Sequence, residues 1–325
     1  MEESNPTKPR SIGRDTIRSH LVLEVASELV DRPEWPYRQA RINLREQGGE
    51  TWPVCLFGSD SPAAIDQVAR GELQVAIINP AAPLALAVRG KGPFKSPIPL
   101  RAITVIPAPD QLAFAVSERT GLQSLRDIRD RRYPLRISIR GQMDHSLHLV
   151  VKEVLSAAGF SFDDVISWGG QIRYDVGLPK SPNRLGAVQR GEVDMIIDEA
   201  VGSWVDTALE SKMVILPFDE PLLERLEGLG FRRAIISKAR YTELKEDVPT
   251  LDFSGFPVYT HANVPDSIVT SICSALEARK EKIPWQEEGP LLPLDRMCRD
   301  TPEGLLTIPL HSAAERFWRA RGYLA

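Results

Sequence analysis

One segment of the chain occurs twice in closely similar form. Residues 70–80 read RGELQVAIINP, and residues 190–200 read RGEVDMIIDEA. In both copies a helical pattern ends at a glycine, Gly71 or Gly191, which suits the left-handed conformation just beyond a helix. A glutamate and a short apolar run follow, and the β-branched residues of each run favour a buried strand. A helix, a turn and a strand used twice predict two similar lobes.

Other parts of the chain alternate in the same way, with a strand followed by a helix. The pairs are VCLF with SPAAIDQVA, LRISIR with HSLHLVVKEVLSAAG, and VYTHAN with PDSIVTSICSALEARK. This rhythm predicts an α/β fold with two lobes, each a mainly parallel sheet flanked by helices. The extended segments 111–118 and 253–263 would connect the lobes as a two-strand hinge. We therefore expect lobe I to hold residues 1–112 and 258–325, and lobe II residues 113–257.

Composition excludes several classes of protein. No stretch of the chain approaches the roughly 20 apolar residues that span a bilayer, so no membrane insertion is expected. The net charge of -4 and pI near 5.9 argue against nucleic acid as a partner. The 3 widely spaced cysteines form neither a disulfide framework nor a zinc motif, and no P-loop, GxGxxG or GxSxG pattern occurs. We expect no metal and no cofactor.

The N-terminal segment MEESNPTKPRSIGRDTIRSH has no apolar core of the kind that a secretory signal requires. We therefore expect cytoplasmic residence for the chain as written. Periplasmic residence would follow if the true start lay upstream or if a signal had been removed.

An arginine-rich run, RDIRDRRYPLRISIR, extends from Arg126 to Arg140. Asp127 and Asp130 lie within it, so a solvated face is the favoured interpretation, and a patch that faces an anion is the alternative.

Four segments carry a resemblance to a known family. They are AIDQVARGELQVAIIN, LRISIRG followed by KEVLSAAGF, the second repeat RGEVDMIID, and the C-terminal IPLHSAAERFWRARGYL. With these segments the chain resembles the TAXI family of solute-binding receptors, which serve TRAP transporters. The resemblance implies a type II periplasmic-binding-protein fold, a small organic acid or amino acid bound between the lobes, and TRAP membrane subunits as partners of an exported chain.

The chain departs from that family in three places. SIGRDTIRSH stands where a glycine-rich opening strand and loop are expected, and MDHSLH, residues 143–148, replaces a cradle of small residues. The second repeat ends in Asp198 and Glu199, where small residues are expected. These departures leave the ligand and the transport role open.

In lobe I the candidate ligand-binding residues are Ser59, Ser61 and Asn79. The segment GSDSPAAID places Ser61 as a helix cap before Pro62, so backbone N–H groups could receive a carboxylate. An ordinary capped turn is the alternative. Asn79 ends the first repeat, at the carboxyl end of its strand, where ligands bind in open α/β sheets.

In lobe II the segment RGQMDHSLH offers Arg140, Asp144, His145 and Ser146. Arg140 could hold a carboxylate bidentately, and His145 or Ser146 could hydrogen bond a polar ligand group. Asp144 is interpreted mainly as the N-cap of the following helix. His145 and His148 have a spacing compatible with metal, but no HExxH pattern supports a zinc site.

Asp198 and Glu199 end a strand that should be buried, so each carboxylate needs a partner, a cleft or a proton. Adjacent strand residues point to opposite faces, so a close pair is not expected. Together with His145 they are the candidate catalytic residues. Binding of a ligand amino group and a structural ion pair are the alternatives.

Further candidates lie in loops or beyond strands of lobe II, where an arginine could neutralise a ligand and an aromatic ring could cover it: Arg173, Tyr174 and Trp204. Core packing is the favoured interpretation for the tryptophan.

Three functions remain open from the sequence. The first is a two-lobed protein that binds a small organic anion in the cleft. The second is a cytoplasmic enzyme on the same scaffold, a decarboxylase or dehydratase of a small carboxylic acid. The third is an intracellular ligand sensor for a protein partner.

Overall fold

The computed structural model describes residues 16–32, 38–44, 54–59, 61–283, 285 and 291–325. The chain separates into two compact units, residues 1–38 and residues 39–325. The described part of the first unit contains one helix, α1 (Ile17–Val30). Most of the N-terminal segment considered above as a possible signal lies outside the described residues. None of the described helices is both long enough and apolar enough to cross a bilayer.

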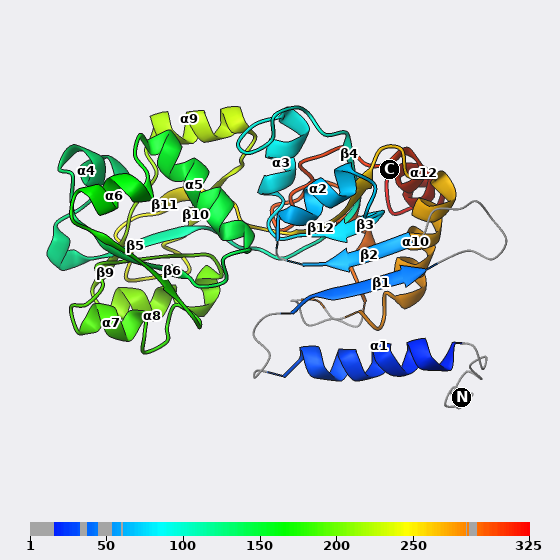
Figure 1. Ribbon diagram of the computed structural model, residues 1–325, viewed down its shortest axis with the longest axis horizontal. Coiled ribbons are helices and arrows are strands. Elements are labelled where there is room, and N and C mark those ends of the chain that lie inside the picture. The colour runs from blue at the N-terminus through cyan, green and yellow to red at the C-terminus, as the bar shows by residue number, and fades with distance from the viewer. Residues whose placement is uncertain (1–15, 33–37, 45–53, 60, 284, 286–290) are drawn as a thin grey trace. The chain divides into compact units, whose positions relative to one another are not determined.

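The second unit contains a five-stranded sheet built from both ends of its sequence (Figure 1). Its strand order is β1 (Ala40–Leu44), β2 (Val54–Gly58), β3 (Val75–Ile77), β12 (Phe256–His261) and β4 (Leu100–Ile106). Strands β2 and β3 run parallel, whereas β1 opposes β2, and β12 opposes both β3 and β4.

Helices cover both faces of this first sheet. On one face α2 (Ala63–Ala69) and α3 (Ala82–Arg89) build a core with Cys55, Ala76 and Tyr259 of the strands. The other face is covered by α10 (Asp266–Arg279), α11 (Leu294–Met297) and α12 (Ser312–Ala320).

A second five-stranded sheet is built from the middle of the chain (Figure 1). Its order is β7 (Gln171–Asp175), β6 (Arg136–Arg140), β8 (Met195–Asp198), β5 (Ala113–Ser117) and β9 (Met213–Ile215). Strand β6 runs parallel to β7 and β8, whereas β5 opposes β8 and β9. A separate pair, β10 (Arg233–Ile236) and β11 (Val248–Leu251), runs antiparallel.

Helices also cover both faces of the second sheet. One face carries α4 (Leu125–Asp130), α5 (Ser146–Ala158), α6 (Phe162–Ser167) and α9 (Glu220–Leu229). The other carries α7 (Leu185–Gln189) and α8 (Val205–Glu210). The predicted α/β fold with two helix-flanked sheets is confirmed. Its sheets are mixed in direction and not mainly parallel, because β1 opposes β2, and β5 and β12, which follow the connections between the sheets, enter them antiparallel to their neighbours.

The duplicated segment has the same local structure in both copies. Gly71 and Gly191 follow α2 and α7 with φ angles of 74° and 78°, so both are helix stops in the left-handed region. Each glycine lies between a paired arginine and glutamate: Arg70 Nε lies 2.6 Å from Glu72 Oε1, and the equivalent pair in the second copy is 2.7 Å apart. Strands β3 and β8 follow, so the predicted order of helix, turn and strand is confirmed twice.

Two segments, 107–112 and 252–255, connect the sheets and run side by side. The Phe253 N–H donates to the Asp110 carbonyl at 2.9 Å, and the Gly255 N–H donates to the Ala108 carbonyl at 2.9 Å. A single β-bridge pairs Gln111 with Asp252. The connections precede β5 and β12, which are themselves strands within the sheets. The proposed lobe boundaries near residues 112 and 257 stay predictions.

Helix α3 contacts the cores of both sheets. Leu84 and Ala87 pack in the core of the first sheet, whereas Ala82 and Leu86 pack in the core that covers the second sheet under α5 and α9. The second unit is therefore held together by apolar packing as well as by its two connections.

Candidate functional site

Four of the predicted site residues meet at the carboxyl ends of β6 and β8. Arg140 is the last residue of β6, and its NH2 group donates to Asp198 Oδ1 at 3.1 Å and to Glu199 Oε1. Its NH1 group lies 2.9 Å from His145 Nε2, at the start of α5. Its side chain is 21% exposed, whereas the two carboxylates are almost entirely buried. The structure therefore places one guanidinium between two acids and an imidazole.

A second arginine, which was not predicted from the sequence, also pairs with Asp198. Arg184, just before α7, is fully buried and donates to Asp198 Oδ2. It also donates to Ser138 Oγ at 3.1 Å and to the Ile197 carbonyl at 3.3 Å. Asp198 thus bridges two guanidinium groups, which agrees with the structural ion pair that the sequence left as an alternative. The sequence indicated that the buried carboxylate of Asp198 needs a partner, but it did not identify Arg184 as that partner.

Asp110, in the connection 107–112, is a second residue that sequence reasoning missed. Its carboxylate accepts hydrogen bonds from the Ala200 N–H at 2.7 Å and the Val201 N–H at 3.1 Å. It also hydrogen bonds to the Glu199 carboxyl group, and burial raises the pKa of both acids. Two buried carboxyl groups in contact cannot both ionise readily, which favours the protonated form of one of them. We call Arg140, His145, Asp198 and Glu199, with their partners Arg184 and Asp110, the Arg140 cluster.

The expectation that Asp198 and Glu199 point to opposite faces is wrong. Both carboxylates contact the same NH2 group of Arg140. Strand β8 ends at Asp198, and Ala200 has a φ of 54°, so the alternation of an extended strand does not continue through Glu199.

Asn79 occupies the position in the first repeat that Glu199 occupies in the second. Its side-chain amide donates to the Gly255 carbonyl at 2.9 Å and to the Phe253 carbonyl at 3.3 Å, both in the connection 252–255. Glu199 contacts Asp110 of the other connection. Each repeat therefore ends in a polar side chain that holds one of the two connections, a role that the sequence did not indicate.

His145 is the N-cap of α5. Its Nδ1 accepts a hydrogen bond from the Leu147 N–H at 3.1 Å. The interpretation of Asp144 as this cap is wrong, because the helix begins one residue later and the imidazole accepts the bond. Burial, together with the charge of Arg140, lowers the pKa of His145 to about 3. The ring is therefore neutral near pH 7.

Ser59 and Asp144 come from the two different sheets and share one partner. The Gln39 side-chain amide donates to Ser59 Oγ at 3.0 Å and reaches Asp144 Oδ2 at 3.4 Å. Ser59 Oγ also accepts from the Ser61 N–H at 3.1 Å, and Ser61 Oγ accepts from the Ala63 N–H at 3.3 Å. The serines thus hydrogen bond to backbone N–H groups before and at the start of α2, but the prediction of Ser61 as the cap is wrong, because the N-cap is Pro62 and α2 begins at Ala63. Gln39 brings this segment next to the loop before α5.

Sequence comparison shows the family. The profile of the NMT1-like family matches residues 59–322, which include both repeats and both connections. The chain belongs to the NMT1-like family. A search of curated proteins found no match.

Several solved structures align with this NMT1-like chain at low similarity. The alkanesulfonate-binding protein SsuA from Xanthomonas axonopodis pv. citri is 16% identical, with 68% of this chain and 60% of that chain covered and a TM-score of 0.33. The periplasmic aliphatic sulphonate binding protein SsuA from Escherichia coli is 16% identical, with 68% and 58% covered and a TM-score of 0.35. The glycine/betaine/L-proline-binding protein (ProX) from Borrelia burgdorferi is 9% identical, with 64% and 63% covered and a TM-score of 0.36. The alignments span less than two thirds of each of these three proteins.

Arg173 and Tyr174, which were expected in a loop or beyond a strand, lie within β7, and Trp204 lies in the core. Arg173 NH2 lies 3.4 Å from Asp175 Oδ1, and the exposed ring of Tyr174 packs on His148 at 5.8 Å between ring centroids. Trp204 is buried in the core, where its Nε1–H donates to the Glu199 carbonyl at 2.8 Å. Trp204 therefore supports Glu199 from inside the protein, as the core interpretation of the tryptophan predicts. Ser146, the first residue of α5, is also buried.

The two histidines at the start of α5 are engaged in other contacts. His148 Nε2 lies 2.9 Å from the Gln142 carbonyl, and His145 uses Nδ1 as a helix cap. Among the described residues, no group of three or more histidine, cysteine, aspartate or glutamate side chains is arranged to hold a metal ion.

Proposed function

We propose that this NMT1-like protein binds a small organic anion, a carboxylate or an amino-acid-like molecule, at the Arg140 cluster. The proposal follows the resemblance of the chain to TAXI receptors, in which two lobes hold such a ligand between them. It is supported by the place of Arg140 at a strand end beside the start of α5, where backbone N–H groups and a guanidinium favour the same anion.

The contact between Arg140 and His145 carries the proposal. A neutral imidazole has one acceptor nitrogen and one N–H. His145 cannot accept from Leu147 at Nδ1 and from Arg140 at Nε2 in the same state, so at one of these contacts two donors face each other. If the ring proton is on Nε2, that donor pair is Arg140 and His145. A ligand oxygen beside them would accept from both groups and remove the conflict.

The raised pKa values of Asp110 and Glu199 favour an anion as the ligand. When Glu199 is protonated, Arg140 faces one fewer negative charge and attracts an external carboxylate more strongly. Because the pKa of Glu199 lies above its usual value, the protonated form persists at pH values where an exposed glutamate is ionised. Anion affinity should therefore fall as the pH rises through the raised pKa of Glu199.

The test begins with mass spectrometry of small molecules that co-purify with the protein, followed by calorimetry with the compound found. Arg140→Gln should weaken binding by about 2 kcal/mol or more, because a charged partner in a largely buried contact is removed. Arg190→Gln is the matched control, since Arg190 forms an exposed pair with Glu192 outside the cluster. Equal affinity of the Arg140→Gln variant, with the fold intact, would contradict the proposal.

For the receptor form of this function we propose TRAP membrane subunits as partners, which requires an exported chain. Cell fractionation distinguishes this from the cytoplasmic residence expected from the sequence. Recovery from the periplasm supports a receptor, and recovery from the cytoplasm supports an enzyme or a sensor.

The pair formed by Asp110 and Glu199 favours an enzyme as the second candidate function. A buried carboxyl group with a raised pKa can donate a proton near neutral pH, as general acids do. We expect Glu199→Gln to lower the turnover of a decarboxylase or dehydratase by about 10²-fold to 10⁴-fold with substrate binding retained. Incubation of the protein with the co-purified acid, monitored for release of carbon dioxide or water, tests this. Tight binding without conversion excludes the enzyme.

A further inference from the structure

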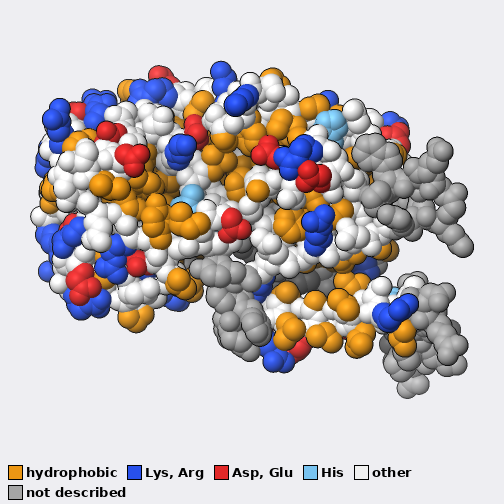
Figure 2. Space-filling model, in the orientation of Figure 1, with side chains coloured by type: hydrophobic (Ala, Val, Ile, Leu, Met, Phe, Trp, Pro, Cys, Tyr) orange, Lys and Arg blue, Asp and Glu red, His pale blue; other side chains and the backbone are white. Residues whose placement is uncertain are grey.

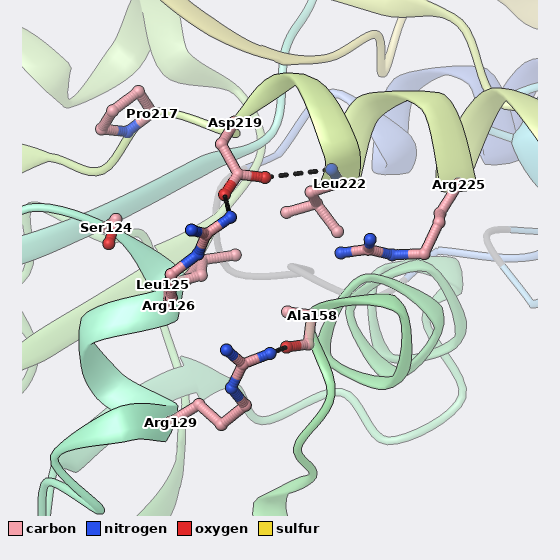
Figure 3. A pocket seen from close by; sticks show the side chains of 9 residues that line it. All are labelled: Ser124, Leu125, Arg126, Arg129, Ala158, Pro217, Asp219, Leu222 and Arg225. Atoms are coloured by element: carbon pink, nitrogen blue, oxygen red, sulfur yellow. Dashed lines mark hydrogen bonds and ion pairs between the residues drawn. The ribbon is translucent and has the colours of Figure 1, made fainter.

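A hollow on the second sheet's helical layer lies outside the Arg140 cluster and gathers three arginines. It lies between α4, the N-terminal end of α9 and the C-terminal end of α5, and its volume is about 110 Å³ (Figure 3). Arg126 and Arg129 come from α4, and Arg225 comes from α9. We call this hollow the Arg225 pocket. Two of its arginines belong to the arginine-rich run that the sequence left as either a solvated face or an anion-facing patch.

Arg126 and Arg225 are each anchored through one guanidinium nitrogen, whereas Arg129 is held by Asp130 as well as by a helix carbonyl. Arg225 donates through Nε to the Ala157 carbonyl at 2.8 Å, and Arg129 donates through NH1 to the Ala158 carbonyl at 3.3 Å. These bonds satisfy carbonyl groups in the last turn of α5, as basic side chains often do at helix ends. A guanidinium carries five N–H donors, so donors remain for a further acceptor. The anchors fix the direction of the side chains without using up their hydrogen bonds.

The charges that line the pocket do not cancel. Arg126 NH2 lies 2.9 Å from Asp219 Oδ2, and Arg129 NH2 lies 2.8 Å from Asp130 Oδ1. Arg225 has no carboxylate within ion-pair distance among the residues that the structure describes. The unpaired charge is therefore that of Arg225, and it lies beside two other guanidinium groups.

The N-terminal end of α9 adds to this positive field. Asp219 caps the helix by accepting from the Leu222 N–H at 3.0 Å, and the positive end of the helix dipole lies at the same point. In Figure 3 the guanidinium groups of Arg126, Arg129 and Arg225 border the same opening. Such a fork of planar donors matches the oxygens of phosphate or sulfate better than it matches a neutral group.

We propose that the Arg225 pocket is a second anion site, which binds a phosphate or sulfate group, free or as the end group of a small metabolite. Arg225 and Arg126 donate to its oxygens, and Arg129 completes the positive wall. The site is separate from the Arg140 cluster, because the two share no residue: the pocket borders the C-terminal end of α5, whereas His145 caps the N-terminal end of that helix.

Calorimetric titration of the full chain with inorganic phosphate, sulfate and glycerol phosphate tests the proposal. Arg225→Gln should weaken phosphate binding by about tenfold, as expected for the loss of a charge-assisted hydrogen bond. Arg131→Gln should leave affinity unchanged, because Arg131 follows the same helix but does not line the pocket. Added chloride should weaken binding, since the arginines are partly exposed.

The variant Asp219→Asn should change the affinity for phosphate in the opposite direction. Asparagine retains the acceptor that caps α9 but removes the charge that competes for Arg126, so phosphate should bind more tightly. A purely structural role of these residues gives no reason for tighter binding. Arg140→Gln should bind phosphate as the unaltered protein does.

Three results would overturn the proposal. They are an absence of binding by inorganic phosphate, sulfate and glycerol phosphate alike, equal affinity in Arg225→Gln and the unaltered protein, or loss of binding in Arg140→Gln alone. The last result would show that the anion binds at the Arg140 cluster. Glycerol phosphate that binds while inorganic phosphate does not would assign the site to a phosphate ester, and the reverse result would assign it to the free ion.

Discussion

At the scale of single residues, the buried pair of Arg184 and Asp198 makes the free energy of unfolding sensitive to substitutions in the Arg140 cluster. Both side chains are fully buried, so neither charge can be hydrated if its partner is lost. We expect Arg184→Met to lower the free energy of unfolding by about 3 to 5 kcal/mol, because Asp198 then keeps only Arg140. Urea unfolding measures this. The double variant Arg184→Met with Asp198→Asn should be less destabilised than the single one, and equal loss would show that charge is not the cause.

His145 predicts a pH dependence of stability. Its pKa is about 3 in the folded protein against an ordinary value of 6.5. Between these values the unfolded chain binds the extra proton, so stability is complete above about pH 6.5 and falls as the pH is lowered towards 3. The slope from this one group approaches about 1.4 kcal/mol per pH unit.

The variant His145→Asn isolates that contribution. Asparagine is also a good N-cap and can accept from the Leu147 N–H, but it does not titrate. Unfolding measured from pH 7 to pH 4 should therefore show a shallower slope for the variant. Parallel curves for the two proteins would refute the assignment of this pH dependence to His145.

The residues of the Arg140 cluster were only partly predictable from the sequence. Arg140 and His145 were found because a strand end followed by a helix start is a local pattern. Arg184 and Asp110 lie far from it in sequence and reach Asp198 and Glu199 only through the fold. Nothing in their local sequence distinguishes them from surface residues. Their pairing with Asp198 and Glu199 therefore could not be predicted from the sequence.

At the scale of elements, the glycine that ends α7 can be tested. Gly191 has a φ of 78°, and a Cβ atom there would lie 2.9 Å from Arg119 NH1. Gly191→Ala should cost about 1 to 2 kcal/mol, since a residue with a side chain is strained in the left-handed region. Gly228, inside α9, is the matched control, because nothing lies within 4 Å of its Cβ position. Gly228→Ala should add about 1 kcal/mol of stability, and thermal melts of both variants test the pair.

The elements themselves were largely predictable, whereas the directions of the strands were not. Both repeats, and the strand β6 followed by the helix α5, occur where hydrophobic periodicity and glycine stops predict them. Strand direction depends on how the chain crosses between the sheets, and β5 and β12 enter antiparallel after the connections. The local sequence pattern predicts whether a segment forms a helix or a strand, whereas the long-range topology determines which strands lie beside it and in which direction.

At the scale of the whole molecule, residues 39–325 form one compact unit that contains both five-stranded sheets. The two connections and α3 join the sheets, and the Arg140 cluster is tied to one connection through Asp110. A ligand held at Arg140 would therefore act on a residue of the connection as well as on β6 and β8. If the proposed anion binds at Arg140, the ionisation of Asp110 and Glu199 would affect both its binding and the contact of β8 with the connection 107–112.

Leu86 of α3 tests whether the two sheets unfold together. It is fully buried and packs in the core that covers the second sheet, although α3 also contributes to the core of the first. Leu86→Ala should cost about 2 to 5 kcal/mol. In a single cooperative unit, native-state hydrogen exchange of β6 and of β12 should lose protection by the same amount. Leu292→Ala, in the core under α10 and α12, is the companion variant, since its side chain contacts only the first sheet's core. If it lowers protection in β12 and leaves β6 unchanged, the sheets unfold separately, and α3 is a contact between two independent halves.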